Sequence, residues 1–293
     1  MKVLFYILLV VTFVLSMVIK ESHAQKLDYA KVADSPEQTI NHMLNIAPVE
    51  GFVSTSKYAA SSLMLGINGV YGFNHKLGFE GYAGIPYFTT KGIKGLSYVQ
   101  GGAFFNFSTK EKMRDTKVIL NYKRTLDVIS STETYTYLAI PAKVKHVLGL
   151  RAGIQHNSSS LRTDGIKIAQ AEADFKLTGI YAGIQSTSSH LIKTQLKGEP
   201  QAVPTGSIYK LFADVMVYPV SKIDNAFLSD QISSGNLGAR AGVVWVQNPY
   251  AKKHQTNAYN PFLGRMNMAL EIGNRPIDGF YFKGGVYWGI IYR

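Results

Sequence analysis

From about residue 61 to the C-terminus, apolar side chains alternate with polar side chains or glycine. This period of two predicts β-strands with two different faces, because successive side chains of a strand point to opposite sides. Residues 280–293 show the pattern most clearly: Phe282, Val286 and Trp288 share an apolar face, and Lys283 lies on the other face. The chain is therefore expected to fold mainly as a sheet whose two faces meet different surroundings.

The alternation predicts an all-β chain of about twelve strands, most of them roughly ten residues long. They cover residues 63–73, 77–85, 96–107, 117–124, 137–145, 148–156, 174–185, 188–196, 209–217, 237–245, 265–273 and 280–293. Turn-forming residues separate the last two segments, which are expected to form a hairpin, and the fifth and sixth segments are expected to form another. A tilted strand of this length is long enough to cross a bilayer.

The short turn at residues 74–76 leaves open a number of strands other than twelve. With both termini in the periplasm and an even number of strands, this turn would lie on the outer side, where the loops of barrels are usually longer. An additional strand near residues 45–55 would change that placement.

The N-terminus has the pattern of a secretory signal. Residues 3–19 form the only long unbroken apolar run, and the small-residue step that ends at Ala24 follows it. The sequence predicts a signal peptide over residues 1–24 and a mature chain that begins at Gln25, with an uncleaved anchor as the alternative. Residues 25–60 are expected to be a leader with a short helix capped at residues 34–37, followed by the barrel over residues 61–293.

The composition favours a membrane barrel over a soluble β-sandwich. Hydrophobic residues make up 46% of the chain and charged residues only 17%, and cysteine is absent, so no disulfide supports the fold. An alternating chain can span lipid only as a closed barrel, because every backbone polar group must be paired there. Aromatic residues gather at predicted strand ends, as interfacial girdles do. We therefore expect an antiparallel transmembrane β-barrel in the cell outer membrane, with a secreted soluble β-protein as the alternative.

Two segments carry a family resemblance. The signal that ends at Ala24, the segment Tyr-Leu-Ala-Ile-Pro-Ala-Lys at residues 137–143 and the segment Gly-Leu-Arg-Ala-Gly at residues 149–153 resemble the porin-family outer-membrane β-barrels of Bacteroidota. The resemblance implies a porin-like fold in a Gram-negative outer membrane. The C-terminus departs from the commonest barrel ending, since Arg293 follows Tyr292 where a terminal aromatic residue is usual.

The charge pattern points to the barrel interior. The chain has a formal net charge of +12, and loss of the predicted signal, which contains two lysines and one glutamate, leaves +11. The predicted pore-lining residues are Lys143, Arg151, Lys210, Arg240, Arg265, Lys283, Glu80, Asp214 and Glu271. A basic lumen predicts passage or binding of small anionic solutes. The alternative is a lumen filled by its own side chains, with these cations paired to carboxylates.

Little in the sequence points to catalysis. His156 and Ser158 share one strand face and are the best candidates for a base and a nucleophile in a lipid-modifying barrel, but no third orienting group accompanies them. No metal site or cofactor motif is present among the scattered histidines or the glycines. The expected protein is not an enzyme and needs no cofactor.

The expected partners follow from export and charge. Outer-membrane lipid and lipopolysaccharide are expected around the barrel, with loop lysines such as Lys252 and Lys253 near phosphates. Nucleic acid is not expected, because the chain is predicted to be exported. A third interpretation makes the barrel the membrane anchor of a surface or secretion complex, bound through its loops and residues 25–60.

Overall fold

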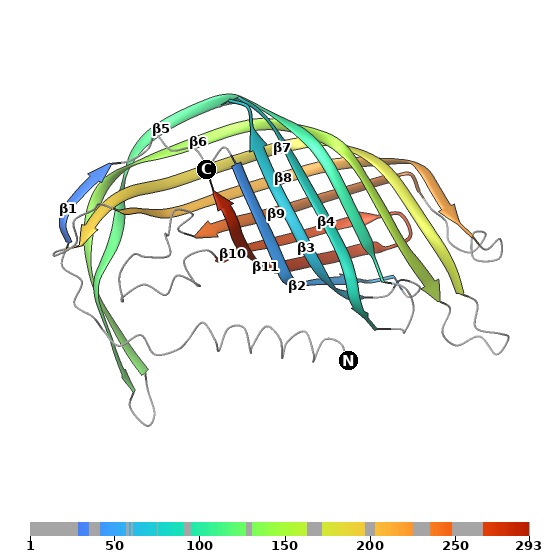
Figure 1. The fold of residues 1–293 in the computed structure, drawn as a ribbon, viewed down its shortest axis with the longest axis horizontal. Coiled ribbons are helices and arrows are strands. Elements are labelled where there is room, and N and C mark those ends of the chain that lie inside the picture. The colour runs from blue at the N-terminus through green and yellow to red at the C-terminus, as the bar shows by residue number, and fades with distance from the viewer. Residues whose placement is uncertain are drawn as a thin grey trace.

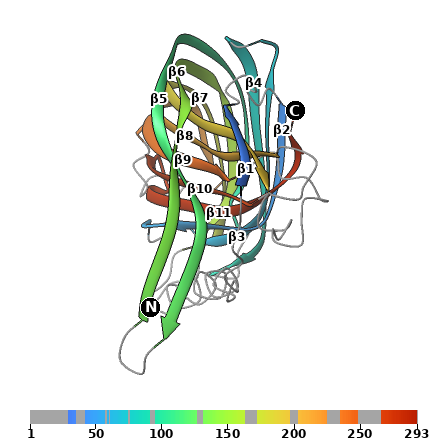
Figure 2. The ribbon, with the colours of Figure 1, turned by 90° about the vertical axis from the view of Figure 1, so that its left-hand side faces the viewer.

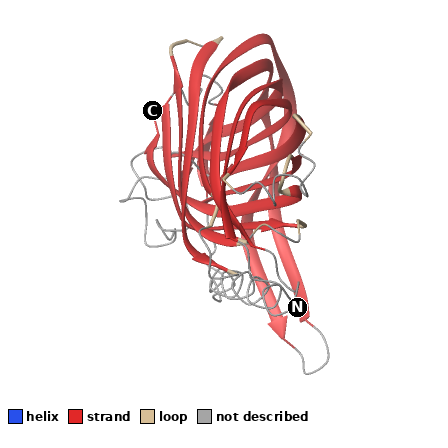
Figure 3. Cartoon of the chain, turned by 90° about the vertical axis from the view of Figure 1, so that its right-hand side faces the viewer, coloured by secondary structure: helices blue, strands red, loops and turns tan. Residues whose placement is uncertain are grey.

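The computed structural model is built from antiparallel β-strands. It describes residues 29–34, 42–56, 59, 61–74, 76–90, 95–126, 131–162, 172–196, 203–224, 235–247 and 266–292. The predicted signal peptide and its cleavage site lie outside these residues. Figure 3 shows that the described chain consists of strands and short connections.

Ten of the eleven strands close into a barrel (Figures 1 and 2). The strands are β1 Tyr29–Asp34, β2 His42–Ser54, β3 Ser62–Gly72, β4 Leu77–Thr89, β5 Ser97–Leu126, β6 Ser131–Arg162, β7 Glu172–Leu196, β8 Val203–Ile223, β9 Leu237–Gln247, β10 Met266–Arg275 and β11 Gly279–Tyr292. Each of β2 to β10 pairs with the next strand, and β11 pairs back with β2. Strand β1 pairs only with the end of β7.

The prediction of about twelve barrel strands is wrong: the structure has ten. Three predicted pairs of strands are single continuous strands, namely β5, β6 and β7. In β6 the alternation keeps its phase through residues 145–148. The predicted hairpin therefore has no turn there, and β6 continues without interruption.

The additional strand left open near residues 45–55 is present as β2. It lies inside residues 25–60, so the described barrel begins at His42, and no helix occurs among the described residues of the predicted leader. A register shift between Ala47 and Glu50 disturbs the alternation, and Pro48 lies within it. Such a bulge bends the strand and moves later side chains to the other face, which hides the period of two.

The outer surface of the barrel is apolar. Ile85, Ile154, Ile184, Val215 and Leu237 are each 62–70% exposed, although they lie in the middle or near the ends of paired strands. A soluble sandwich would bury these side chains, whereas a membrane barrel presents them to lipid. This surface excludes the alternative of a secreted soluble β-protein.

Aromatic side chains border the apolar surface at both ends. We call the end where β2 begins and β11 ends the terminal end, and the opposite end the distal end. At the terminal end, His42 stacks on Tyr71 at 4.4 Å between ring centroids, and Tyr209 stacks on Trp245 at 6.1 Å. At the distal end, Tyr87, Phe88 and Phe280 are exposed. The two rings of aromatic residues have the placement of membrane-interface girdles.

Four strands continue past the terminal end. The last β4–β5 pair is Leu77 with Phe105, but β5 and β6 remain paired to Leu126 and Ser131. Strands β7 and β8 also extend past the terminal end, but β7 pairs with β6 only as far as Val144 and His190, and the rest of the β5–β6 hairpin projects by itself (Figure 2). We call the part of β5–β8 beyond Phe105 the extension. Among the described residues, no helix is long and apolar enough to cross a membrane.

Candidate functional site

The interior of the barrel collects charged side chains from most of its strands. They occupy the positions that alternate with the apolar outer residues, so the period of two that makes the outer face apolar also directs them inward. The buried members include Glu50, Arg151, Asp214, Arg240 and Glu271, each at most 8% exposed. Burial of a charge is costly unless an opposite charge compensates it.

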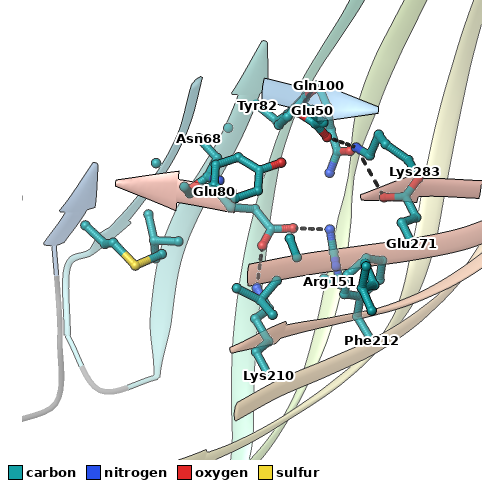
Figure 4. Close-up of a pocket in the computed structure, with 18 residues that line it drawn as sticks. Glu50, Asn68, Glu80, Tyr82, Gln100, Arg151, Lys210, Phe212, Glu271 and Lys283 are labelled. Atoms are coloured by element: carbon teal, nitrogen blue, oxygen red, sulfur yellow. Dashed lines mark hydrogen bonds and ion pairs between the residues drawn. The ribbon is translucent and has the colours of Figure 1, made fainter. Parts of the chain in front are cut away.

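Glu80 on β4 is held by two cations (Figure 4). One of its carboxylate oxygens lies 2.6 Å from a terminal guanidinium nitrogen of Arg151, and the other accepts a hydrogen bond of 2.7 Å from Lys210 Nζ. The Arg151 guanidinium also lies over the Phe212 ring, 4.4 Å from its centroid. Strands β4, β6 and β8 are thereby tied together across the lumen.

Asp214 and Arg240 form the most deeply buried pair. Arg240 Nε donates to Asp214 Oδ2 at 2.7 Å, and the two side chains are 1% and 0% exposed. Arg151 Nε lies 3.5 Å from the other oxygen of Asp214, so this carboxylate faces two arginines. Arg240 also donates to the hydroxyl of Tyr98 at 2.5 Å and to the amide oxygen of Gln100 at 2.7 Å.

Lys283 on β11 links two further carboxylates. Its Nζ lies 3.5 Å from Glu271 and 3.7 Å from Glu50. The Tyr82 hydroxyl donates to Glu50 at 2.5 Å, and the Tyr281 hydroxyl donates to Glu271 at 2.7 Å. A tyrosine hydroxyl thus donates to one oxygen of each of these two carboxylates.

The charges of this interior network balance. It contains five carboxylates and five cations among the described residues: Glu50, Glu80, Asp214, Glu271, Asp278, Arg151, Lys210, Arg240, Arg275 and Lys283. The excess of positive charge predicted for the lumen is therefore absent from the described interior. Paired cations attract anionic solutes far less than free cations do.

The distal end of the interior is filled by a hydrophobic core. Its fully or almost fully buried members include Phe52, Met64, Leu96, Phe175, Leu177, Met216, Tyr218, Ile277 and Tyr281. Arg275 lies against this core, 4.0 Å from the centroid of the Tyr281 ring, with Nε 3.3 Å from Asp278. An aqueous channel needs a polar lining along its whole length, and these residues give the distal end a packed apolar one.

At the terminal end the interior is less tightly filled. A cavity of about 120 Å³ lies there between the side chains of the network (Figure 4). Asn68, Gln100, Lys210 and Lys283 are among its lining residues. The interior of the barrel thus has a recess toward the terminal end, and the hydrophobic core closes the distal end.

Glycines on the inner face provide room for the tyrosine rings. A Cβ atom on Gly102 or on Gly153 would overlap the Tyr181 hydroxyl or a backbone carbonyl oxygen of the paired strand. Both positions therefore need glycine for close approach of β5, β6 and Tyr181.

Gly153→Ala should lower the free energy of unfolding by about 1–3 kcal/mol, because the added methyl group overpacks the contact with β5. Urea titration of the detergent-solubilised protein, followed by gel mobility without boiling, measures this change. Gly101→Ala is the matched control, since a Cβ there meets nothing within 4 Å. Equal midpoints for the two variants would contradict the packing role of Gly153.

The structure brings together seven of the nine predicted pore-lining residues: Glu80, Arg151, Lys210, Asp214, Arg240, Glu271 and Lys283. Lys143 does not belong to this group. It lies on the extension with its side chain 47% exposed, 4.0 Å from Glu111. Arg265 lies outside the described residues.

Sequence reasoning missed other members of the interior. Glu50 lies in strand β2, which the sequence offered only as an alternative, and Arg275 and Asp278 lie in or next to the segment predicted as a turn. The inner tyrosines, including Tyr82 and Tyr281, have the same alternation phase as the inner charges. This shared phase was the feature of the sequence that could have placed these tyrosines in the interior.

The catalytic candidates lie outside the interior. His156 is exposed on the outer face, and its Nδ1 is 2.9 Å from Thr178 Oγ1. Within the described chain, no hydrogen bond joins His156 to Ser158, and no group of three or more acidic or histidine side chains could hold a metal ion.

A closed antiparallel barrel with an apolar outer face and a polar interior is a membrane-spanning β-barrel, and such barrels belong to outer membranes. The chain is therefore an outer-membrane β-barrel protein.

The chain was compared with protein-family models, curated proteins and solved structures. No model of a known protein family matches the chain, and no curated protein matches it. The outer-membrane β-barrel that the resemblance implies is present, but its Bacteroidota origin is not supported. A solved structure of the outer membrane protein OprD from Pseudomonas aeruginosa aligns at 8% identity and a TM-score of 0.21, over 88% of this chain and 96% of that one. A bacterial polysaccharide outer membrane secretin aligns at 10% identity and a TM-score of 0.21, over 87% and 100%. A double variant of OccD1 (OprD) aligns at 11% identity and a TM-score of 0.18, over 90% and 100%.

Proposed function

We propose that this protein is a closed outer-membrane barrel that acts as a membrane-anchored component of an assembly and not as a general diffusion pore. The observation that carries the proposal is the closure of the lumen. The hydrophobic core fills the distal end, and the balanced network of ten charged side chains crosses the middle.

The extension supports the same proposal. Beyond Phe105, strand β5 has no partner in β4, so the extension offers a long strand edge and two broad sheet faces on the side of the termini. Exposed side chains of this part, such as Lys110 and Glu111, are charged. Charged residues protect a strand edge from unspecific pairing but leave it available to a complementary partner. The predicted leader begins on this side, where β1 pairs with β7.

The proposal predicts that the folded wild-type protein gives no steady conductance above leak in a planar lipid bilayer. Folding of the sample before reconstitution is verified by heat-modifiable gel mobility, because closed barrels stay folded in detergent until they are boiled, and insertion is verified by flotation of the protein with liposomes. Regular conductance steps of the wild-type protein would refute the closed barrel.

A second function is favoured by one observation, the recess of about 120 Å³ beside Lys210 and Lys283. Under this function the barrel passes or binds small anionic solutes after the distal core rearranges. The same recordings distinguish the two functions: a reversal potential that follows the chloride gradient in potassium chloride would support anion passage in place of the anchor.

A further inference from the structure

The outer face of the extension carries basic side chains just beyond the terminal aromatic girdle. We call them the basic row: Lys110, Lys112 and Arg114 of β5, His146 of β6 and His190 of β7. The three β5 side chains are exposed, and the two histidines are partly exposed.

Strand pairing places the row on the same sheet face as the lipid-facing residues of β6, although Val144, the cross-strand partner of Lys112 and His190 on this face, is fully buried. In β6, the exposed residues Leu148, Leu150 and Ile154 point to lipid, and the pairing with β7 runs without a shift from Val144 to Arg162. His146 therefore keeps the phase of Leu148, and His190 lies on the same face.

A bulge brings the β5 lysines to this face. Phe105 and Phe107 are exposed on the outer surface, and a register shift lies between Asn106 and Ser108. After this shift, Lys110 pairs with His146 and Lys112 pairs with Val144. The bulge thus moves the even-numbered residues of β5 to the outside.

The row lies at the height of the lipid headgroups. Lys110 and His146 follow the pair Ser108–Leu148 by two residues, which is about 7 Å along a strand and roughly 5 Å along the membrane normal for the usual tilt. The polar headgroup layer extends about 5–7 Å beyond the hydrocarbon on each side. Lys112 is two residues further out, and a lysine stem can reach back to the interface.

The local charge is positive on this face. Among the described side chains of the row and its cross-strand neighbours, no carboxylate lies on the outer face, and Glu111 lies on the opposite face beside Lys143 at 4.0 Å. We propose that the basic row binds the phosphates of anionic phospholipids in the leaflet at the terminal end. The row fixes the depth of the barrel and the orientation of the extension relative to the membrane.

This inference rests on the membrane barrel and not on the state of the lumen. Conductance tests the closed lumen, and lipid binding tests the row, so each proposal can fail without the other.

The test is native mass spectrometry of the folded, detergent-solubilised full chain with phosphatidylglycerol or phosphatidylcholine. A lysine near an anionic lipid surface contributes about fivefold in affinity. Lys110→Gln/Lys112→Gln should therefore weaken phosphatidylglycerol binding about 25-fold and leave phosphatidylcholine binding unchanged. Heat-modifiable mobility shows that the variant is folded.

The matched control is Lys143→Gln/Lys145→Gln, which removes the same charge from the other face of the same sheet. It should bind phosphatidylglycerol as the wild-type protein does. Millimolar inorganic phosphate should not displace the lipid, because a single free ion lacks the anchoring acyl chains. The inference is overturned if both variants lose binding equally, if Lys110→Gln/Lys112→Gln binds as wild type, or if inorganic phosphate competes at that concentration.

Discussion

Asp214→Ala should destabilise the barrel by about 3–5 kcal/mol, because it leaves Arg240 and Arg151 buried without the carboxylate between them. Asp214 is fully buried, and the side chains of Arg240 and Arg151 are only 1% and 4% exposed, so bulk solvent cannot easily replace the lost carboxylate. Urea titration in detergent, followed by gel mobility without boiling, gives the change in the free energy of unfolding.

The matched control for this variant is Glu111→Ala. This variant also removes a carboxylate from beside a cation, Lys143, but the two side chains are about half exposed and 4.0 Å apart. Removal of such a surface pair costs about 0–1 kcal/mol. A similar loss for the two variants would mean that the interior network is solvated, and the closed lumen would then be in doubt.

Phe52→Ala/Tyr281→Ala should turn a silent barrel into a conducting one. The two rings pack at 5.6 Å between centroids on neighbouring strands of the distal core, and both are at most 1% exposed. Their removal leaves a cavity large enough for water beside the polar groups of Arg275 and Glu271. Single-channel recording in a planar bilayer measures the result, and we expect fluctuating current where the wild-type protein shows only leak.

The control for the conducting variant is Tyr87→Ala/Phe88→Ala, which removes two aromatic rings from the outer surface at the same end. It should stay silent, since it leaves the interior intact. Silence of Phe52→Ala/Tyr281→Ala, with normal heat-modifiable mobility, would show that other residues close the lumen.

The alternation of side chains predicted the two faces of the barrel but not its strand count. Because β6 continues its phase past His146, a sequence cannot distinguish one long strand from two that meet at a tight turn. The bulge beside Pro48 removed the alternation from β2, so a barrel strand looked like part of a leader. How far a strand continues beyond the membrane depends on its pairing with neighbouring strands. The period of two within one strand carries no information about that pairing.

The candidate site was predictable in part for the same reason. Arg240, Asp214 and Glu271 were identified because each alternates with lipid-facing residues on its own strand. Their pairing was not predictable, since it joins side chains from different strands whose relative register comes from barrel closure. The excess of lysine and arginine in the composition therefore suggested a basic lumen, while the described interior is balanced.

Closure between β2 and β11 joins the first described strand of the barrel to the last one, with Met43 opposite Tyr292. During folding, this contact cannot form until β11 is available to pair with β2. Before then the sheet has two unpaired edges, at β2 and at the newest strand, and these edges are open to other chains. Loss of β11 would therefore leave the edges of β2 and β10 unpaired and open to pairing with other chains.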